Sequence, residues 1–445
     1  MKINKTLIFA RDDHYGIGRD GTIPWYNRED LQFFQRITTS GKSTNRKNAL
    51  ICGTKTYETM KNINPVNRTF FVVGNNYYPS IQDAINNIDE TYTDIFFVGG
   101  AQIYQECQYL VDEMYITHIK GNFNCDTHFK PDFSHFQLFS KTNCMTLTIS
   151  HYKSLNTDET YNNLCYKVLD EGISKDDRTG TGTISIFGHH MKFSLKTLPV
   201  ITTKKVYLKG VIEELIWFLK GDVNSKTLET KGVGIWKGNS SREFLDNSRL
   251  DDYIEGECGP IYGFQWRHWN APYHGPSNEY YKNKYKDKGI DQIHSIINTI
   301  KTNPDSRRII LNAWNVEQLP EMVLPPCHVM CQFYVVDDQI DCHMYQRSAD
   351  VFLGLPFNIT SYAILTHIIG HFTNKTPRNL YISIGDAHIY KNHIEQVNLQ
   401  LTRTSYDPPS ISINPGVQNI DNLTYDDIKI HNYVSHPTIK ATMAV

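Results

Sequence analysis

The stretch LPPCH at residues 324–328, followed by YQRSAD at 345–350, is the most informative part of this chain. It places Cys327 after two prolines and just ahead of two predicted strands, the second of which ends in an arginine, Arg347. A thiol attacks only as its thiolate, and a nearby guanidinium favours that form while also gripping an anionic substrate through paired hydrogen bonds. The pattern therefore predicts a nucleophilic cysteine beside an anion-binding arginine.

Cys327 also has a plainer interpretation, because a free cysteine is usually a small buried hydrophobe. The prolines before it, Pro325 and Pro326, make a loop rigid instead of continuing a core strand, which favours the catalytic interpretation. Cysteine motifs do not transfer between families, so this short pattern alone leaves both interpretations open.

The segments after the cysteine predict a strand pair. Cys331–Val336 and Ile340–Arg347 are typical of strands, and the polar residues 337–339 between them are typical of a turn. Because successive side chains of a strand point to opposite faces, Arg347 should lie on the face opposite the apolar side chains of its strand.

A helix is predicted over Val211–Leu219, because its apolar residues recur on one face. Glu214 precedes Trp217 and Phe218 by three and four positions, so its carboxylate should lie against aromatic surface. Burial there would raise the pKa of Glu214 towards neutrality, which suits proton transfer. We expect the neighbouring Glu213 to be an ordinary boundary acid.

Further segments accompany the cysteine in chain order. They are DRTGTG at 177–182, EELIWF at 213–218, GPIYG at 259–263, SRR at 306–308, GLPFN at 354–358 and GDAHIY at 385–390. Together with LPPCH they resemble the thymidylate synthase family, from about Tyr161 to the final Val445. The resemblance implies an α+β fold for this part of the chain.

The resemblance also implies a reaction. Cys327 would attack C6 of deoxyuridine monophosphate (dUMP) and form a covalent adduct, with 5,10-methylenetetrahydrofolate as the one-carbon and hydride donor. Glu214, Tyr262 and His328 would form the proton-transfer network. No metal is implied.

The resemblance assigns the substrate contacts as well. For dUMP these are Arg178, Arg347 and Ser348 on the phosphate from one chain, Arg307 and Arg308 on the same phosphate from a partner chain, Asn358 on the pyrimidine edge, and His388 and Tyr390 on the ribose hydroxyl. For the folate these are Asp350 on the pterin and Trp236, Asn239, Leu353, Gly354 and Phe357 around it. Residues shared between two chains imply a homodimer, although the arginine pair can also be read as a basic surface pair.

The first half, residues 1 to about 155, alternates short β-branched and aromatic runs with helical patterns. Strands are predicted at Thr6–Ala10, Asn48–Cys52, Thr69–Val73, Asp94–Val98 and Glu113–Ile119, and helices near Glu29–Thr38, Ser80–Asn87 and Ala101–Tyr109. Strands separated by helices predict an α/β fold with a mostly parallel sheet.

In this half the pair Gly99-Gly100 follows a predicted strand and opens a helix, where backbone N–H groups can receive a phosphate. It is accompanied in order by Gly16-Ile17-Gly18, Ile23-Pro24-Trp25, Asp30, Lys55-Thr56, Arg68 and Asp126-Thr127. This set resembles the dihydrofolate reductase family over about residues 4 to 155.

Asp30 is the acid of this second resemblance. It precedes Leu31, Phe33 and Phe34, which should line an apolar cleft, and a lone acid there can hold a pterin and assist its protonation. The resemblance implies that Thr127 supports Asp30, that Phe34 contacts the folate, and that Arg68 clamps the folate's glutamate carboxylate. It implies NADPH contacts at Ala10, Ile17, Gly18, Lys55, Thr56, Gly99 and Gly100.

The coenzyme site departs from its family in one respect. Basic residues that usually grip the 2′-phosphate of NADPH would fall near Thr54 and Asn75, and neither is basic. Lys55 is the cation left, so the preference for NADPH over NADH should be weaker than usual.

Composition restricts the class of protein. The chain has 445 residues, 40% of them apolar and 21% charged, which indicates a globular protein of more than one domain. Its net charge of −2 gives no support to a nucleic-acid scaffold. Nine irregularly spaced cysteines indicate a reducing compartment, and we expect a cytoplasmic protein without signal peptide or membrane span.

We therefore predict a bifunctional enzyme of dTMP synthesis, with a reductase domain at 1–155, a short linker at 156–159 and a synthase domain at 160–445. The synthase would release dihydrofolate and the reductase would restore tetrahydrofolate. Two alternatives stay open: an active synthase whose degenerate reductase only braces a dimer, and a nucleotide- or RNA-binding regulator without turnover. The intact nucleophile disfavours the regulator, because a mere binder does not need it.

Overall fold

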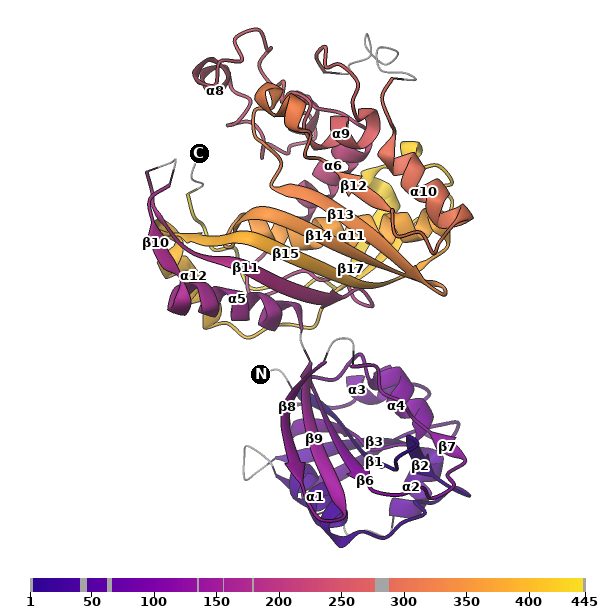
Figure 1. The fold of residues 1–445 in the computed structure, drawn as a ribbon. Helices are drawn as coiled ribbons and strands as arrows, with labels where there is room; N and C mark the ends of the chain where they lie inside the picture. Colours follow the sequence, from indigo (N-terminus) through magenta and orange to yellow (C-terminus); the bar gives the residue numbers. More distant parts are fainter. Residues whose placement is uncertain are drawn as a thin grey trace. The chain divides into compact units, whose positions relative to one another are not determined.

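The computed structural model describes residues 3–40, 46–61, 66–133, 136–154, 156–177, 180–276 and 288–442. The chain forms two compact units, Met1–Asn156 and Thr157–Val445, both drawn in Figure 1. Among the described residues, no helix is long and apolar enough to cross a lipid bilayer.

The first unit is built on a seven-stranded sheet in the order β4-β3-β5-β1-β6-β9-β8. Its strands are β1 (Asn4–Arg11), β2 (Gly16–Gly18), β3 (Lys47–Gly53), β4 (Arg68–Val73), β5 (Tyr92–Phe97), β6 (Glu113–Ile119), β7 (Thr127–His128), β8 (Phe136–Asn143) and β9 (Leu147–Ser154), and its helices are α1 (Arg28–Thr39), α2 (Thr54–Met60), α3 (Ile81–Asn86) and α4 (Ala101–Cys107). The pairings from β4 to β6 are all parallel, which confirms the predicted α/β class.

Two antiparallel strands, β9 and β8, extend this sheet beyond β6 and were not predicted. Strand β8 is exposed at every residue after Phe136, so its sequence carries no alternation between a buried and an exposed face. The inner strands are different. Leu7, Ile51 and Phe97 in these strands are completely buried, as expected for parallel strands covered on both faces.

The helix α1 carries the acid of the first unit. Its N-cap is Asn27, whose side chain accepts the N–H groups of Glu29 and Asp30 at 3.0 and 3.2 Å. Acids in a first turn also suit the positive end of the helix dipole. These two features fix the start of α1 within one residue of the prediction.

The second unit is built on a six-stranded sheet in the order β10-β11-β15-β14-β13-β12, in which only β14 and β15 are parallel (Figure 1). Its strands are β10 (Ile173–Lys175), β11 (Thr183–Ser194), β12 (Ile310–Asn312), β13 (His328–Val336), β14 (Gln339–Asp350), β15 (Thr376–Tyr390), β16 (Ser410–Ile413) and β17 (Ile428–His431), and its helices are α5 (Thr157–Glu171), α6 (Leu208–Leu219), α7 (Ser225–Glu229), α8 (Arg242–Asn247), α9 (Tyr262–His268), α10 (Gln292–Thr302), α11 (Gly354–Thr373) and α12 (Ile394–Leu401). The mixed sheet with its helices confirms the predicted α+β class. The buried helix α11 packs on β14 and β15.

The predicted strand pair is confirmed as the antiparallel strands β13 and β14. The turn between them is one residue shorter than predicted, because Asp337 adopts a left-handed conformation with φ 51° and Gln339 already belongs to β14. Along β14 the apolar residues are buried and Arg347 lies on the other face, as predicted.

The segment predicted as a linker is mostly helical. Residues 157–159 form the first turn of α5. The carboxylate of Asp158 is buried there and accepts the N–H and O–H groups of Thr202 and Thr203 at 2.7 to 3.0 Å. Most of the polar residues that indicated a linker therefore form the first turn of α5, and Asp158 fastens this turn to its own unit.

Candidate active sites

The predicted nucleophile Cys327 lies in the loop just before β13. Its N–H donates to the hydroxyl of Tyr262 at 2.7 Å, and a guanidinium nitrogen of Arg347 lies 3.8 Å from its Sγ. The same guanidinium donates to the carbonyls of Pro325 and Pro326 at 2.8 and 2.9 Å. The proline loop therefore holds the arginine beside the thiol, as the opening pattern predicted.

The charge state of Cys327 differs from the expectation. Arg347 does lower the pKa of the thiol, but burial is the larger effect and leaves that pKa above its usual value. The same guanidinium also donates to the two proline carbonyls, so its charge is shared among several acceptors. One arginine is thus too little to make the thiolate the resting form.

The predicted rise in the pKa of Glu214 on α6 is present, but the aromatic side chain in contact with its carboxylate comes from another segment. Its carboxylate accepts the indole N–H of Trp236 at 2.7 Å, and burial raises its pKa to about 7. Glu213 differs from the prediction, since it is only 6% exposed and forms an ion pair of 2.7 Å with Lys231. Lys231 lies in the loop after α7 and is not adjacent to Glu213 in sequence, so local pattern could not reveal the pair.

His328 and Asn358 form a polar contact at the base of this site. The side-chain nitrogen of Asn358 lies 2.6 Å from Nε2 of His328, and burial lowers the pKa of His328 to about 4, so its ring is neutral. Gln346 donates to the amide oxygen of Asn358 at 2.8 Å and fixes how that amide is turned. Gln346 was not among the predicted site residues, although a polar side chain on the buried face of β14 could have indicated its role.

Asp350 lies where β14 leads into α11. Its carboxylate accepts the N–H groups of Phe352 and Leu353 at 3.0 and 3.1 Å, which places Gly354 at the start of the helix beside it. Lys204, which was not predicted, is buried beneath this turn and donates to the carbonyl of Phe352. Burial lowers the pKa of Lys204 to about 7.

The other synthase residues are less closely connected. His388 on β15 is oriented by Asp386, whose carboxylate lies 3.0 Å from its Nδ1, and its ring meets Tyr390 edge-on at 5.2 Å. Ser348 pairs with Asp386 across the sheet. Asn239 and Phe357 are half-buried, Arg307 and Arg308 are exposed, and Arg178 lies outside the described residues.

In the first unit, Asp30 is half-buried on the first turn of α1. Burial raises its pKa, while a hydrogen bond from Thr117 opposes that rise. Thr117 is therefore the hydroxyl beside Asp30, and the assignment of Thr127 to this role is wrong. The antiparallel pairing of β2 with β7 puts Thr127 opposite Gly18 instead. Alternation from Tyr115, which packs on Phe33 of α1, could have identified Thr117.

The apolar residues after Asp30 divide into two groups. Phe33 is 8% exposed and packs edge-on against Tyr115 with ring centroids 5.7 Å apart, so it belongs to the core and not to a cleft. Phe34 is partly buried and Leu31 is 49% exposed, which leaves these two available to a ligand. Arg68 at the start of β4 donates to the hydroxyl of Thr38 near the other end of α1 at 3.0 Å.

Several of the residues predicted to bind the coenzyme follow the parallel strands β3 and β5. Gly99 has φ +131°, and a side chain there would come 3.1 Å from the hydroxyl of Thr56. Thr54 stands over Gly74, where a side chain would collide with its hydroxyl at 2.2 Å. Lys55, beside Thr54 at the start of α2, is exposed, as is Asn75. Ala10 lies on β1, and Ile17 and Gly18 lie on β2.

The family model for thymidylate synthase matches residues 159–445, and the family model for dihydrofolate reductase matches residues 4–155. A bifunctional dihydrofolate reductase-thymidylate synthase of Paramecium tetraurelia is 39% identical over the whole of both chains. The one of Glycine max is 35% identical over 99% of this chain and 95% of its own length.

Another relative matches part of this chain. The thymidylate synthase of Homo sapiens is 50% identical over 279 residues, which is 62% of this chain and 88% of the human protein. Both family matches fall in the order of the two structural units, and the full-length relatives carry the same arrangement. The chain belongs to the family of bifunctional dihydrofolate reductase–thymidylate synthases.

Proposed function

We propose that the second unit methylates dUMP to dTMP with 5,10-methylenetetrahydrofolate, through attack of Cys327 on C6 of the uracil ring. The observation that carries this proposal is the thiol held 3.8 Å from the guanidinium of Arg347. A phosphate arriving with dUMP would draw that guanidinium, and the proline carbonyls would keep it within reach. With its pKa of about 7, Glu214 can exchange a proton with the ring at physiological pH.

The remaining synthase residues would orient the substrates. Asn358, fixed by Gln346 and by the neutral ring of His328, presents one defined amide face to the pyrimidine. His388, whose Nδ1 is held by Asp386, would bind the ribose hydroxyl through its Nε2. Asp350 and the start of α11 would bind the pterin, with Trp236, Asn239, Leu353 and Phe357 around it.

The first unit would reduce the dihydrofolate released by the synthase, with NADPH as hydride donor. The raised pKa of Asp30 favours its protonated form, which can supply a proton to the pterin. Phe34 on α1, and Arg68, which donates to Thr38 of the same helix, would bind the rest of the folate. Ala10, Ile17, Gly18, Thr56, Gly99 and Gly100 would surround the coenzyme.

Spectrophotometric assay of both half-reactions on the purified chain tests this assignment. We expect dTMP formation from dUMP and NADPH oxidation by dihydrofolate in the same preparation. Synthase activity without NADPH oxidation would support a reductase unit that serves only as a brace. Binding of dUMP without any turnover would support a regulator instead.

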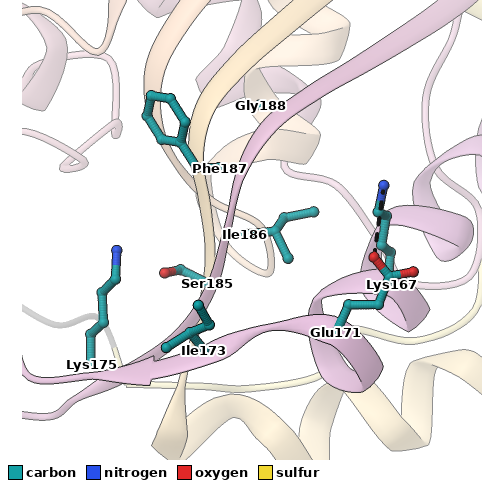
Figure 2. A pocket seen from close by; sticks show the side chains of 8 residues that line it. All are labelled: Lys167, Glu171, Ile173, Lys175, Ser185, Ile186, Phe187 and Gly188. Carbon is teal, nitrogen blue, oxygen red and sulfur yellow. Dashed lines mark ion pairs between the residues drawn. The ribbon is translucent and has the colours of Figure 1, made fainter.

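We further propose a homodimer formed through the second unit, in the cytoplasm. Phe187 on β11 is 83% exposed and Tyr334 on β13 is 56% exposed, which is unusual for large aromatic side chains of a central sheet. Figure 2 shows the hollow beside Phe187, lined by Ile173 and Ile186 and bordered by the ion pair of Lys167 with Glu171. All nine cysteines are free, as suits a reducing compartment.

Mixing two inactive variants tests whether the partner chain completes the site. Arg308→Ala and Cys327→Ser should each abolish synthase activity, yet subunit exchange between them should restore up to about a quarter of wild-type turnover per chain. The reason is that one site of each hybrid dimer would inherit both intact residues. Lys301→Ala, a change of an exposed cation on α10, is the matched control and should stay active.

Recovered activity would be measured after native mass spectrometry has shown that hybrid dimers form. Hybrid dimers without recovery would mean that Arg308 serves the site of its own chain.

Coenzyme choice can be tested at Lys55. NADPH differs from NADH by the 2′-phosphate, whose recognition depends on cationic side chains. Since Thr54 and Asn75 are neutral, we expect a weak preference for NADPH in the wild type, and Lys55→Ala should lower that preference by about tenfold, the effect of one charge-assisted contact. The measurement is kcat/KM of the reductase with both coenzymes.

Lys61→Ala provides the control, because Lys61 is a nearby exposed lysine that is already paired with Glu58. A strong preference for NADPH that survives Lys55→Ala would show that another residue reads the phosphate.

A further inference from the structure

The most deeply buried acid of the first unit is not used by the proposed reaction. Asp12 follows β1 and has no exposed surface. One oxygen of its carboxylate accepts the N–H groups of His14 and Gly16, both at 2.8 Å, and the other accepts the N–H of Phe123 at 3.2 Å. A single side chain thus joins the loop after β1 to the segment between β6 and β7.

The donors around Asp12 require a carboxylate. Burial alone would raise the pKa of Asp12, but the amides of Gly16, Phe123 and His14 and the thiol of Cys125 outweigh burial and lower that pKa. The group is therefore ionised and acts only as an acceptor. An asparagine of the same shape would turn N–H donors towards other donors, so the position selects for charge and not for size.

The contact between the two segments is close-packed. A Cβ added at Gly16 would lie 2.4 Å from the Cβ of Cys125, so no side chain fits there. Gly16 opens β2, which pairs with β7 through Gly16–His128 and Gly18–Thr127. The position of β2 is consequently determined from one side by Asp12 and from the other by β7.

One of the segments that Asp12 joins carries residues with an assigned role, and the other packs against the chain that follows β2. Strand β2 carries Ile17 and Gly18, which we assigned to the coenzyme. The ring of Phe123 packs against Trp25 with centroids 5.2 Å apart, so the same carboxylate also supports the chain that follows β2. Loss of the Asp12 hydrogen bonds would therefore remove support from Gly16 at the start of β2 and from Trp25 in the chain that follows it.

We propose that Asp12 is a positioning residue of the reductase, which holds β2 in the conformation that binds the coenzyme. The inference rests on the proposed function, because it takes β2 to be part of the NADPH site. The inference concerns affinity for the coenzyme more than the chemical step. Asp12 contacts β2 and Phe123, which packs on Trp25, but among the described residues it does not contact Asp30.

Asp13 offers a matched control in the same loop. Its carboxylate also bridges to the other segment, lying 2.6 Å from Nε2 of His118 and accepting the N–H of Gly121 at 2.8 Å. However, the Asp13 side chain is 47% exposed and does not bond to Gly16. Loss of an exposed bridge should cost much less than loss of a buried one.

The experiment compares Asp12→Asn with Asp13→Asn in the full chain. Asp12→Asn should raise KM for NADPH by about tenfold or more, because small displacements of a binding element carry costs of this order. Its KM for dihydrofolate should change less than about twofold, and Asp13→Asn should change neither constant by more than that. Synthase kcat/KM, measured on the same samples, reports whether the second unit is intact.

If Asp12→Asn leaves the first unit unfolded, two substitutions of Cys125 still test the inference. Cys125→Ala removes one donor to the carboxylate and should raise KM for NADPH about threefold, whereas Cys125→Ser keeps a donor and should stay near wild type.

An unchanged KM for NADPH in Asp12→Asn, or equal rises in both KM values together with a lower Tm, would overturn the inference and leave a structural role only. If Asp12→Asn does not fold, an unchanged KM for NADPH in Cys125→Ala would likewise overturn the inference. A wild-type chain that does not oxidise NADPH would instead overturn the proposed function itself, so the two failures are distinguishable.

Discussion

Cys327→Ser is expected to lower thymidylate formation by about 10⁴-fold or more, the scale on which loss of an enzyme nucleophile acts. A hydroxyl ionises far less readily than a thiol, so a guanidinium that favours the thiolate of Cys327 cannot make the serine oxygen a comparable nucleophile. Dihydrofolate reduction by the same protein should change less than about twofold, because the two reactions lie in separate compact units. Steady-state assay of both reactions measures these effects.

Cys331→Ala is the control for this substitution. Cys331 lies four residues further along, is buried in the core on β13, and burial raises the pKa of its thiol well above the usual value. It should therefore be unreactive, and its loss should affect stability more than turnover.

A covalent adduct provides the second readout. The wild-type chain, incubated with 5-fluoro-dUMP and methylenetetrahydrofolate, should retain both molecules through denaturation, and Cys327→Ser should retain neither. A mass spectrum that placed the adduct on any other residue would contradict the assignment of the nucleophile.

Asp30→Asn is expected to lower reductase kcat near neutral pH by about 10²- to 10⁴-fold, the usual contribution of a general acid. The change keeps the shape of the side chain and its contact to Thr117 but removes the proton that the acid can exchange. Thymidylate formation should be unaffected. Glu29→Gln on the same helical turn is the control, since Glu29 is exposed and only its backbone N–H meets Asn27.

The pH dependence follows from the direction of the shift. Burial raises the pKa of Asp30, so the protonated acid persists to a higher pH than an exposed aspartate allows. Reductase kcat should fall as pH rises through that raised pKa, and the asparagine variant should lack this limb. An Asp30→Asn enzyme with the turnover and the pH profile of the wild type would rule out Asp30 as the proton-handling group.

Local pattern was enough for the features that depend on neighbours in sequence. The helix around Glu214 follows from apolar spacing, and burial raises the pKa of its carboxylate, as predicted. The same holds for Arg347, whose position on β14 follows from the two-residue period of a strand. These inferences succeed because helix and strand periods fix side-chain directions without reference to the rest of the chain.

Features that depend on distant segments were decided by the tertiary structure. Strand register put Thr117 beside Asp30 and moved Thr127 to Gly18, and a lysine of another loop turned Glu213 into half of an ion pair. The pKa of the Cys327 thiol depends on a balance between burial and a guanidinium shared with two carbonyls. Such results are set by which segments pack together, and periodicity along one segment carries no information about its partner across the fold.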